Sequence, residues 1–140
     1  MPNWTENNLT IKSKTKRHLD TLMNRIKSEE SEFDFDKIIP MPKDIDPNKP
    51  LSSEDRKKPN WYDWSVENWG TKWNSSDVSV ERISDTEAEY YFLTAWCPPM
   101  EIYLALLNKF NRFNNHKFEW ICVDEDERKP YDLFQLTEEA

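Results

Sequence analysis

Two cysteines, two histidines and the aspartates Asp34 and Asp36 are the side chains of this sequence whose types and spacing first suggest chemistry. Cys97 stands directly before Pro98-Pro99, where a helix is expected to begin, and a helix N-terminus lowers the pKa of a thiol. A cysteine nucleophile also needs a histidine base, and the sequence places neither His18 nor His116 beside it. A zinc site would need both cysteines, Cys97 and Cys122, together with the two histidines, yet no CxxC or HxxxH pair occurs. Two free, buried thiols are therefore the favoured interpretation, and the reactivity of Cys97 stays open.

Asp34 and Asp36 form the second candidate site. Residues two apart on a strand project to the same side, and paired carboxylates suit a hard cation. The alternative is a solvated strand edge whose charges deter edge pairing, and we favour it because no third ligand follows from the spacing. With a single glycine the chain has no Gly-rich phosphate loop, and it contains no GxSxG or HExxH motif. We expect a protein that is not an enzyme and binds no metal or cofactor.

Four of the seven tryptophans surround the only glycine, Gly70. They are Trp61, Trp64, Trp69 and Trp73. In one interpretation they close one end of a small core and Gly70 turns the chain at positive φ. In the other they form an aromatic surface for a partner protein or for stacked bases. Exposing so many indoles is costly, which favours packing, with the rims of Trp61 and Trp64 left to touch a partner.

The chain has 27 acidic and 19 basic side chains and a formal net charge of −8. This balance disfavours non-specific binding to nucleic acid or to an anionic membrane and permits binding to a basic partner. The acidic side chains that we expect to attract such a partner are Asp34, Asp36, Glu125 and Asp126. One basic group contrasts with them and lies on the outer side of the first predicted helix: Lys14, Lys16, Arg17, Arg25 and Lys27.

Hydrophobic periodicity predicts the elements that must position these residues. Strands are expected near residues 9–11, 33–39, 78–83, 88–96 and 118–123, with a short edge strand at 131–136, and helices at 15–29 and 98–112. This order predicts an α+β fold, a ferredoxin-like two-layer sandwich with two helices on a mainly antiparallel sheet of four to six strands. We expect one domain over 1–140, with a long polar loop at 43–60, a Trp-rich insertion at 61–73 and an acidic C-terminal segment at 124–140.

Four motifs occur in the order found in the YubB-like proteins, a family named for a ferredoxin-like domain of phage and plasmid proteins. They are Met1-Pro-Asn-Trp4, the segment from Phe33 to Pro42, Asn68-Trp-Gly-Thr-Lys-Trp73 and Thr94-Ala-Trp-Cys-Pro-Pro99. The chain resembles this family over roughly residues 1–123. The resemblance implies a ferredoxin-like fold and an origin in a mobile element, and it supplies no catalytic residue. It also implies that the Cys97 position caps the second helix, while Thr5 stands where the family often has cysteine.

These observations favour a non-enzymatic phage or mobile-element protein that occupies a surface of a host or defence-system protein, such as an anti-CRISPR-type inhibitor. A nucleic-acid-binding complex is one such partner, because carboxylates can stand in for phosphates in its groove. The expected contacts are loop 43–60 with Trp61 and Trp64, assisted by the acidic side chains. The alternative is a nucleic-acid-binding module that uses the basic first helix. The N-terminus lacks the layout of a signal peptide, and no segment is long and apolar enough to span a membrane, so we expect a cytoplasmic protein of a host cell.

Overall fold

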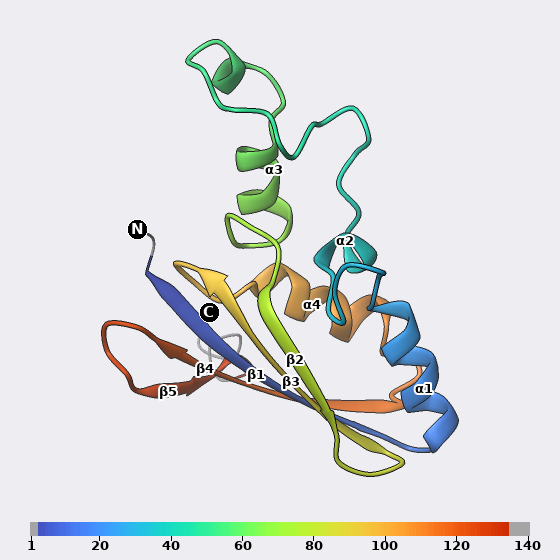
Figure 1. Cartoon of the computed structure of the whole chain (residues 1–140). Helices are drawn as coiled ribbons and strands as arrows, with labels where there is room; N and C mark the ends of the chain where they lie inside the picture. The colour runs from blue at the N-terminus through green and yellow to red at the C-terminus, as the bar shows by residue number, and fades with distance from the viewer. Residues whose placement is uncertain (1–2, 135–140) are drawn as a thin grey trace.

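The computed structural model describes residues 3–134, which form one antiparallel sheet of five strands with helices on one side (Figure 1). The elements in chain order are β1 (Trp4–Ser13), α1 (Lys16–Arg25), α2 (Phe35–Ile38), the 3-10 helix η1 (Asp55–Lys57), α3 (Trp61–Asn68), β2 (Ser76–Arg82), β3 (Glu87–Ala95), α4 (Met100–Lys109), β4 (His116–Asp124) and β5 (Pro130–Asp132). The strand order is β2-β3-β1-β4-β5.

This topology confirms the predicted α+β sandwich. β1 lies between β3 and β4 and pairs with both in antiparallel register, and β2 pairs with β3 as the predicted hairpin. The first four strands therefore have the ferredoxin-like order, and β5 extends the sheet beyond β4. α1 and α4 correspond to the two predicted helices, each shorter than its apolar pattern.

Strict alternation along β1 separates the two sides of the sheet. Thr5, Asn7, Leu9 and Ile11 are buried toward the helices, whereas the residues between them are exposed or half-buried. The core on the helix side is strongly aromatic, and the ring of Phe33 stacks on that of Phe92 with centroids 4.9 Å apart. Large rings thus supply the buried area that a chain with only 36% hydrophobic residues needs.

One buried amide organises the polar part of this core. The side-chain NH2 of Asn7 donates to the hydroxyl of Thr94 (3.0 Å) and to the backbone carbonyl of Thr5 (3.1 Å). Its carbonyl oxygen accepts from the indole N–H of Trp120 (3.0 Å) and from the thiol of Cys122 (3.4 Å). Asn7 is fully buried, so these partners replace the water that its amide loses on folding.

The predicted strand at 33–39 is wrong. Asp34 instead caps the short helix α2, its carboxylate accepting from the backbone N–H of Asp36 at 2.9 Å. Phe35 and Ile38, three residues apart, then bury the same side of one helical turn. The extra strand that this segment would have supplied is therefore missing, and α2 packs against α4.

The segment from Lys27 to Ser75 links α1 to β2, and we call it the insertion. Its first part, with α2, lies against the sandwich, and its later part with η1 and α3 rises from it (Figure 1). Its polar part, 43–60, contains only η1 as regular structure. The expected Trp-rich segment 61–73 begins with helix α3, which the sequence did not predict. Of the predicted acidic segment 124–140, the described part contains β5 and the buried Leu133, while 135–140 lie outside the described residues.

Candidate functional site

Helix α3 is set by a capping arrangement at its start. The side-chain oxygen of Asn60 accepts from the backbone N–H of Asp63 at 2.9 Å, and its NH2 group donates to the carboxylate of the same residue at 2.9 Å. Asn60 is buried, which fixes the first turn of the helix. Trp61 and Tyr62 in that turn are half-buried, so their rings reach the surface of the insertion.

The chain turns back toward the sheet at Gly70. Its φ of +80° lies in the left-handed region, which confirms the predicted bend. A Cβ at this position would lie 3.0 Å from the backbone nitrogen of Met100 and 3.2 Å from that of Glu101, at the start of α4. Gly70 is therefore required both by its backbone angle and by close contact with a helix.

The tryptophans around Gly70 divide between the core and the surface. Trp69 is only 5% exposed, and its indole N–H donates to the backbone carbonyl of Ile39 at 2.9 Å. Trp64 is half-buried and packs edge-on against Trp69, with ring centroids 5.2 Å apart. Trp61 and Trp73 are half-buried and line an open cleft. Trp69 is therefore packed as the first interpretation predicts, whereas Trp61, Trp64 and Trp73 keep part of their rings accessible, and a role for them in binding stays a prediction.

Five aromatic rings, in two groups bridged by one cation, make a strip that we call the aromatic surface: Trp4, Trp61, Tyr62, Trp73 and Trp96. Ring centroids are 6.0 Å apart for Trp4 and Trp73, 6.3 Å for Tyr62 and Trp96, and 6.0 Å for Trp61 and Tyr62. The ammonium of Lys72 joins the two halves, 4.4 Å from the ring centre of Trp73 and 4.9 Å from that of Trp96. These rings come from β1, α3 and the segments that follow Gly70 and β3.

Trp96 is the most exposed ring of the aromatic surface. Its side chain is 46% exposed, and its φ of +70° is an unusual conformation for a large non-glycine residue. The backbone N–H of Trp96 donates to the carbonyl of Asn3 at 2.7 Å, which holds the turn in place. An exposed indole on a strained and anchored turn is typical of a functional position.

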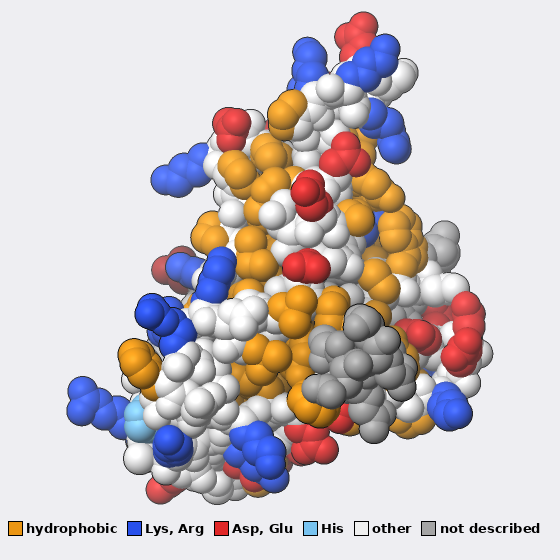
Figure 2. Space-filling view, turned by 180° about the vertical axis from the view of Figure 1, so that it is seen from behind, with side chains coloured by type: hydrophobic (Ala, Val, Ile, Leu, Met, Phe, Trp, Pro, Cys, Tyr) orange, Lys and Arg blue, Asp and Glu red, His pale blue; other side chains and the backbone are white. Residues whose placement is uncertain are grey.

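Beside the aromatic surface lies a cleft of about 630 Å³ between loop 41–48 and α3. Its walls combine rings with charges of both signs, including Trp61, Trp69, Asp36, Lys43 and Lys72. On the side of the molecule seen in Figure 2, hydrophobic side chains run through the insertion between acidic and basic ones. The mixture suits contact with a polar protein surface better than burial of a small apolar ligand.

The structure does not place Asp34 and Asp36 as a carboxylate pair on one strand face. The carboxylate of Asp34 also accepts from the side-chain NH2 of Asn74 at 2.8 Å, and that of Asp36 accepts from the backbone N–H of Met41 at 2.7 Å. Both carboxylates therefore hold the base of the insertion together. Within residues 3–134 no group of three or more His, Cys, Asp or Glu side chains is arranged to hold a metal ion.

Glu125 and Asp126, the predicted acidic contacts after β4, lie at the start of β1. A carboxylate oxygen of Glu125 accepts from the backbone N–H of Trp4 at 2.9 Å, and one of Asp126 accepts from the side-chain NH2 of Asn3 at 2.7 Å. Both residues are exposed. They therefore border the Trp4 end of the aromatic surface, a proximity that their sequence positions did not predict.

The basic side chains near α1 are only partly available to a ligand. Lys16 forms an ion pair with Asp20 at 2.9 Å, and the Arg25 guanidinium lies 4.3 Å from the ring centre of Phe110. Lys14, Arg17 and Lys27 are exposed.

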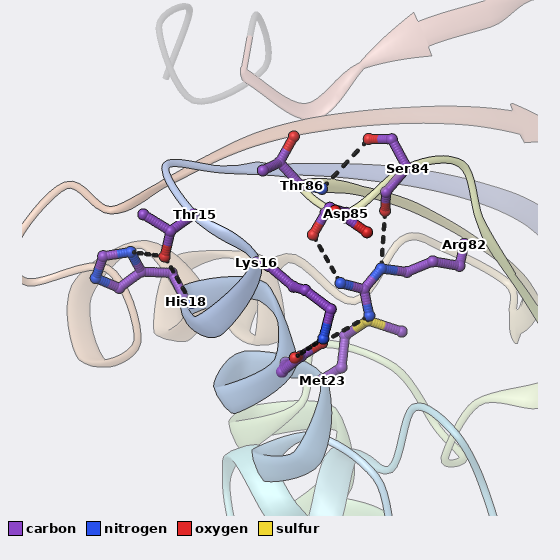
Figure 3. Close-up of polar contacts among 9 residues, drawn as sticks. Thr15, Lys16, His18, Met23, Arg82, Ser84, Asp85 and Thr86 are labelled. Atoms are coloured by element: carbon purple, nitrogen blue, oxygen red, sulfur yellow. Dashed lines mark hydrogen bonds and ion pairs between the residues drawn. The ribbon is translucent and has the colours of Figure 1, made fainter.

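Arg82 adds a second cation to Asp20, at 2.8 Å, and donates to the backbone carbonyls of Ser84 and Asp85 (Figure 3). Its guanidinium thereby ties the β2–β3 turn to α1. The hydrogen bonds from Lys16 and Arg82 lower the pKa of Asp20. Two cations thus share one carboxylate in a structural contact, which makes Lys16 less available to a ligand than the sequence indicated.

The thiols and imidazoles do not come together. Cys97 follows β3, whose Ala95 pairs with Trp4, while His116 pairs with Ser13 at the other end of β1. Ten strand residues separate those ends by about 30 Å. Both cysteines are free, but only Cys122 is buried, so the prediction of a buried Cys97 is wrong.

The thiol of Cys97 donates to the carbonyl of Gly70 at 3.1 Å, and partial burial of its sulfur together with the nearby carboxylate of Asp124 raises its pKa. It does not cap α4, whose N-cap residue is Pro99 without a side-chain cap. A raised pKa keeps the group as a thiol, which disfavours a nucleophilic role.

Comparison with known proteins gives no relative whose residues could be set beside those of this site. No protein-family model matches the chain, and neither curated proteins nor solved structures give a match. The likeness to YubB-like proteins stays a prediction from the four motifs. In the part of the chain that the structure describes, no helix has the length and apolar character needed to cross a membrane.

Proposed function

We propose that this chain is a non-enzymatic binding module that engages a partner protein through the aromatic surface and the adjoining insertion. The observation that supports this most directly is the exposure of Trp96 at the centre of a strip of five rings. Tryptophan and tyrosine contribute a disproportionate share of binding energy at protein interfaces. The resemblance to phage and plasmid proteins makes a host or defence-system protein the expected kind of partner.

The arrangement of Cys97 and the histidines supports a role without catalysis. A nucleophile and its base must lie within hydrogen-bond reach, and these groups occupy opposite ends of β1. The pKa of the Cys97 thiol is raised, and burial lowers the pKa of His116. A protonated thiol and a distant imidazole together give no activated nucleophile.

Nucleic-acid binding is the weaker candidate. RNA-binding modules of this general architecture stack bases on aromatic side chains of the uncovered sheet face. Here that face carries Glu6, Asn8, Glu89 and Glu119 on neighbouring strands, and Tyr91 donates its hydroxyl to Glu6 at 2.9 Å. These carboxylates repel phosphate. The lysines on the same face, Lys12 and Lys117, pair with each other near its far end, where the exposed Lys14, Arg17 and Lys27 are the other candidates for that function.

The proposal is tested by affinity capture from a host lysate with three forms of the protein. Trp96→Ala removes the exposed ring of the aromatic surface, and Phe113→Ala removes a ring that is 77% exposed near the far end of the sheet. We expect the native protein and the Phe113 variant to capture the same partner, and the Trp96 variant to lose it. Equal capture by all three forms would contradict the proposal, as would binding of RNA or DNA that is abolished by changing Lys14, Arg17 and Lys27.

A further inference from the structure

The ammonium of Lys72 occupies a cage of aromatic rings. It lies 4.4 Å from the ring centre of Trp73, 4.9 Å from that of Trp96 and 5.9 Å from that of Tyr62. Among residues 3–134 no carboxylate lies within 4.0 Å of this ammonium, so ring faces are its nearest stabilising groups. Rings grouped around a cation are the arrangement by which proteins recognise ammonium and guanidinium groups.

The three rings of the cage belong to separate elements, and none is fully buried. Tyr62 is in α3, Trp73 follows Gly70, and Trp96 follows β3. Core packing would not require Trp96 to hold its indole outward on a strained turn. The geometry therefore serves a site that is open to solvent, with Lys72 as its present occupant.

A second cation and two carboxylates lie close to the cage. The guanidinium of Arg56 is 5.8 Å from the ring centre of Tyr62, so this ring attracts guanidinium as well as ammonium. The Trp4 ring extends the cage beyond Trp73, and the exposed carboxylates of Glu125 and Asp126 lie at the start of β1 beside it. Aromatic faces with carboxylates beside them complement a positively charged segment.

We propose, on the basis of the function inferred above, that the cage of Tyr62, Trp73 and Trp96 binds an arginine or lysine side chain from a basic segment of the partner protein. Lys72 is an internal occupant that the incoming side chain displaces. Its flexible stem allows the ammonium to move into water, and a planar, weakly hydrated guanidinium then stacks on the indoles. Glu125 and Asp126 attract the rest of the basic segment, in keeping with the net charge of −8.

The inference is tested by calorimetric titration of the intact protein with hexa-arginine amide at two salt concentrations, with hexa-glutamate as the negative peptide. Lys72→Ala empties the cage, and we expect it to bind the arginine peptide about 3- to 10-fold more tightly than the native protein does. Trp96→Ala should weaken binding about 3- to 10-fold or more. Lys43→Ala is the matched control, because it removes one exposed positive charge beside the same cleft without opening the cage.

Several outcomes would overturn the inference. Equal tightening by the Lys43 and Lys72 variants would mean that net charge alone governs the affinity. Stronger binding of oligothymidylate than of the arginine peptide, with the same dependence on Trp96, would replace the basic segment by stacked bases. If Trp96→Ala does not fold, the peptide must still shift the indole N–H resonance of Trp73 in the native protein, and no shift would refute the proposed cage.

Failure of this inference is separable from failure of the proposed function. A partner that is captured by the native protein and lost with Trp96→Ala, but that does not compete with the arginine peptide, would retain the aromatic interface and remove the cation site. Capture that does not depend on Trp96 would remove both.

Discussion

Substitution of Gly70 by alanine should destabilise the protein by about 2–5 kcal/mol. The left-handed backbone angle costs a residue with a Cβ about 1–2 kcal/mol. A Cβ would also lie 3.0 Å from the backbone nitrogen of Met100, and relieving such crowding costs about 1–3 kcal/mol. Urea unfolding followed by tryptophan fluorescence measures the free energy of unfolding, and the slope with urea should stay unchanged.

Two further variants separate the causes of this loss. Asn114 has a φ of +56° and is exposed, so Asn114→Ala carries the backbone cost alone, about 1 kcal/mol. In Gly70→Asn the new residue adopts the left-handed φ at little cost but still places a Cβ against α4. This variant should therefore remain clearly less stable than the native protein. A Gly70→Ala protein within about 0.5 kcal/mol of the native free energy of unfolding would refute both the angle and the contact.

Three other predictions concern groups in or near the core. Asn7→Ala leaves the indole N–H of Trp120 without its acceptor and should cost about 2–3 kcal/mol in urea unfolding; an unchanged midpoint would contradict the buried network. Cys97 has a raised pKa, so iodoacetamide should alkylate it at pH 7 more slowly than it alkylates free cysteine, and faster labelling would oppose this. Burial lowers the pKa of His116 below 6.5, so the neutral imidazole is favoured in the folded state. The stability that the neutral His116 imidazole contributes is complete above pH 6.5 and is lost as the pH falls through the folded-state pKa. His116→Gln should therefore reduce the drop in Tm between pH 7 and pH 5.

The segment around Asp34 shows why a correct fold class can include a wrong element. Phe33 and Phe35 alternate with aspartates, which matches a strand, but Phe35 and Ile38 also have the spacing of one helical turn. The choice is made by the carboxylate of Asp34, which caps the backbone N–H of Asp36 and binds Asn74 from the far end of the insertion. That partner lies 40 residues away in the sequence, beyond the reach of local periodicity.

The aromatic surface was only half predictable for a similar reason. Trp61 and Trp73 are close in sequence and drew attention to the insertion. Trp4 and Trp96 join them because β1 pairs with β3 in a register that sets Trp4 opposite Ala95. Lys72 lies between the rings only because Gly70 turns the chain. A single lysine in the sequence looks the same whether its side chain is solvated or packed against rings. The approach of Glu125 and Asp126 likewise depends on the pairing of β1 with β4.

Gly70 links the stability of the sandwich to the geometry of the proposed interface. Its carbonyl accepts from the thiol of Cys97, and the neighbouring Thr71 donates its buried hydroxyl to the carbonyl of Ala95 at 2.7 Å. The chain that carries Lys72 is thus joined to the end of β3, directly before Trp96. Rings that are positioned in advance lose less conformational freedom on binding. Gly70→Ala should therefore weaken the binding of the arginine peptide even under conditions in which the variant stays folded. A change in the distal part of loop 43–60, such as Ser53→Ala, should leave that affinity unchanged. If both variants bind like the native protein, the cage does not depend on the turn.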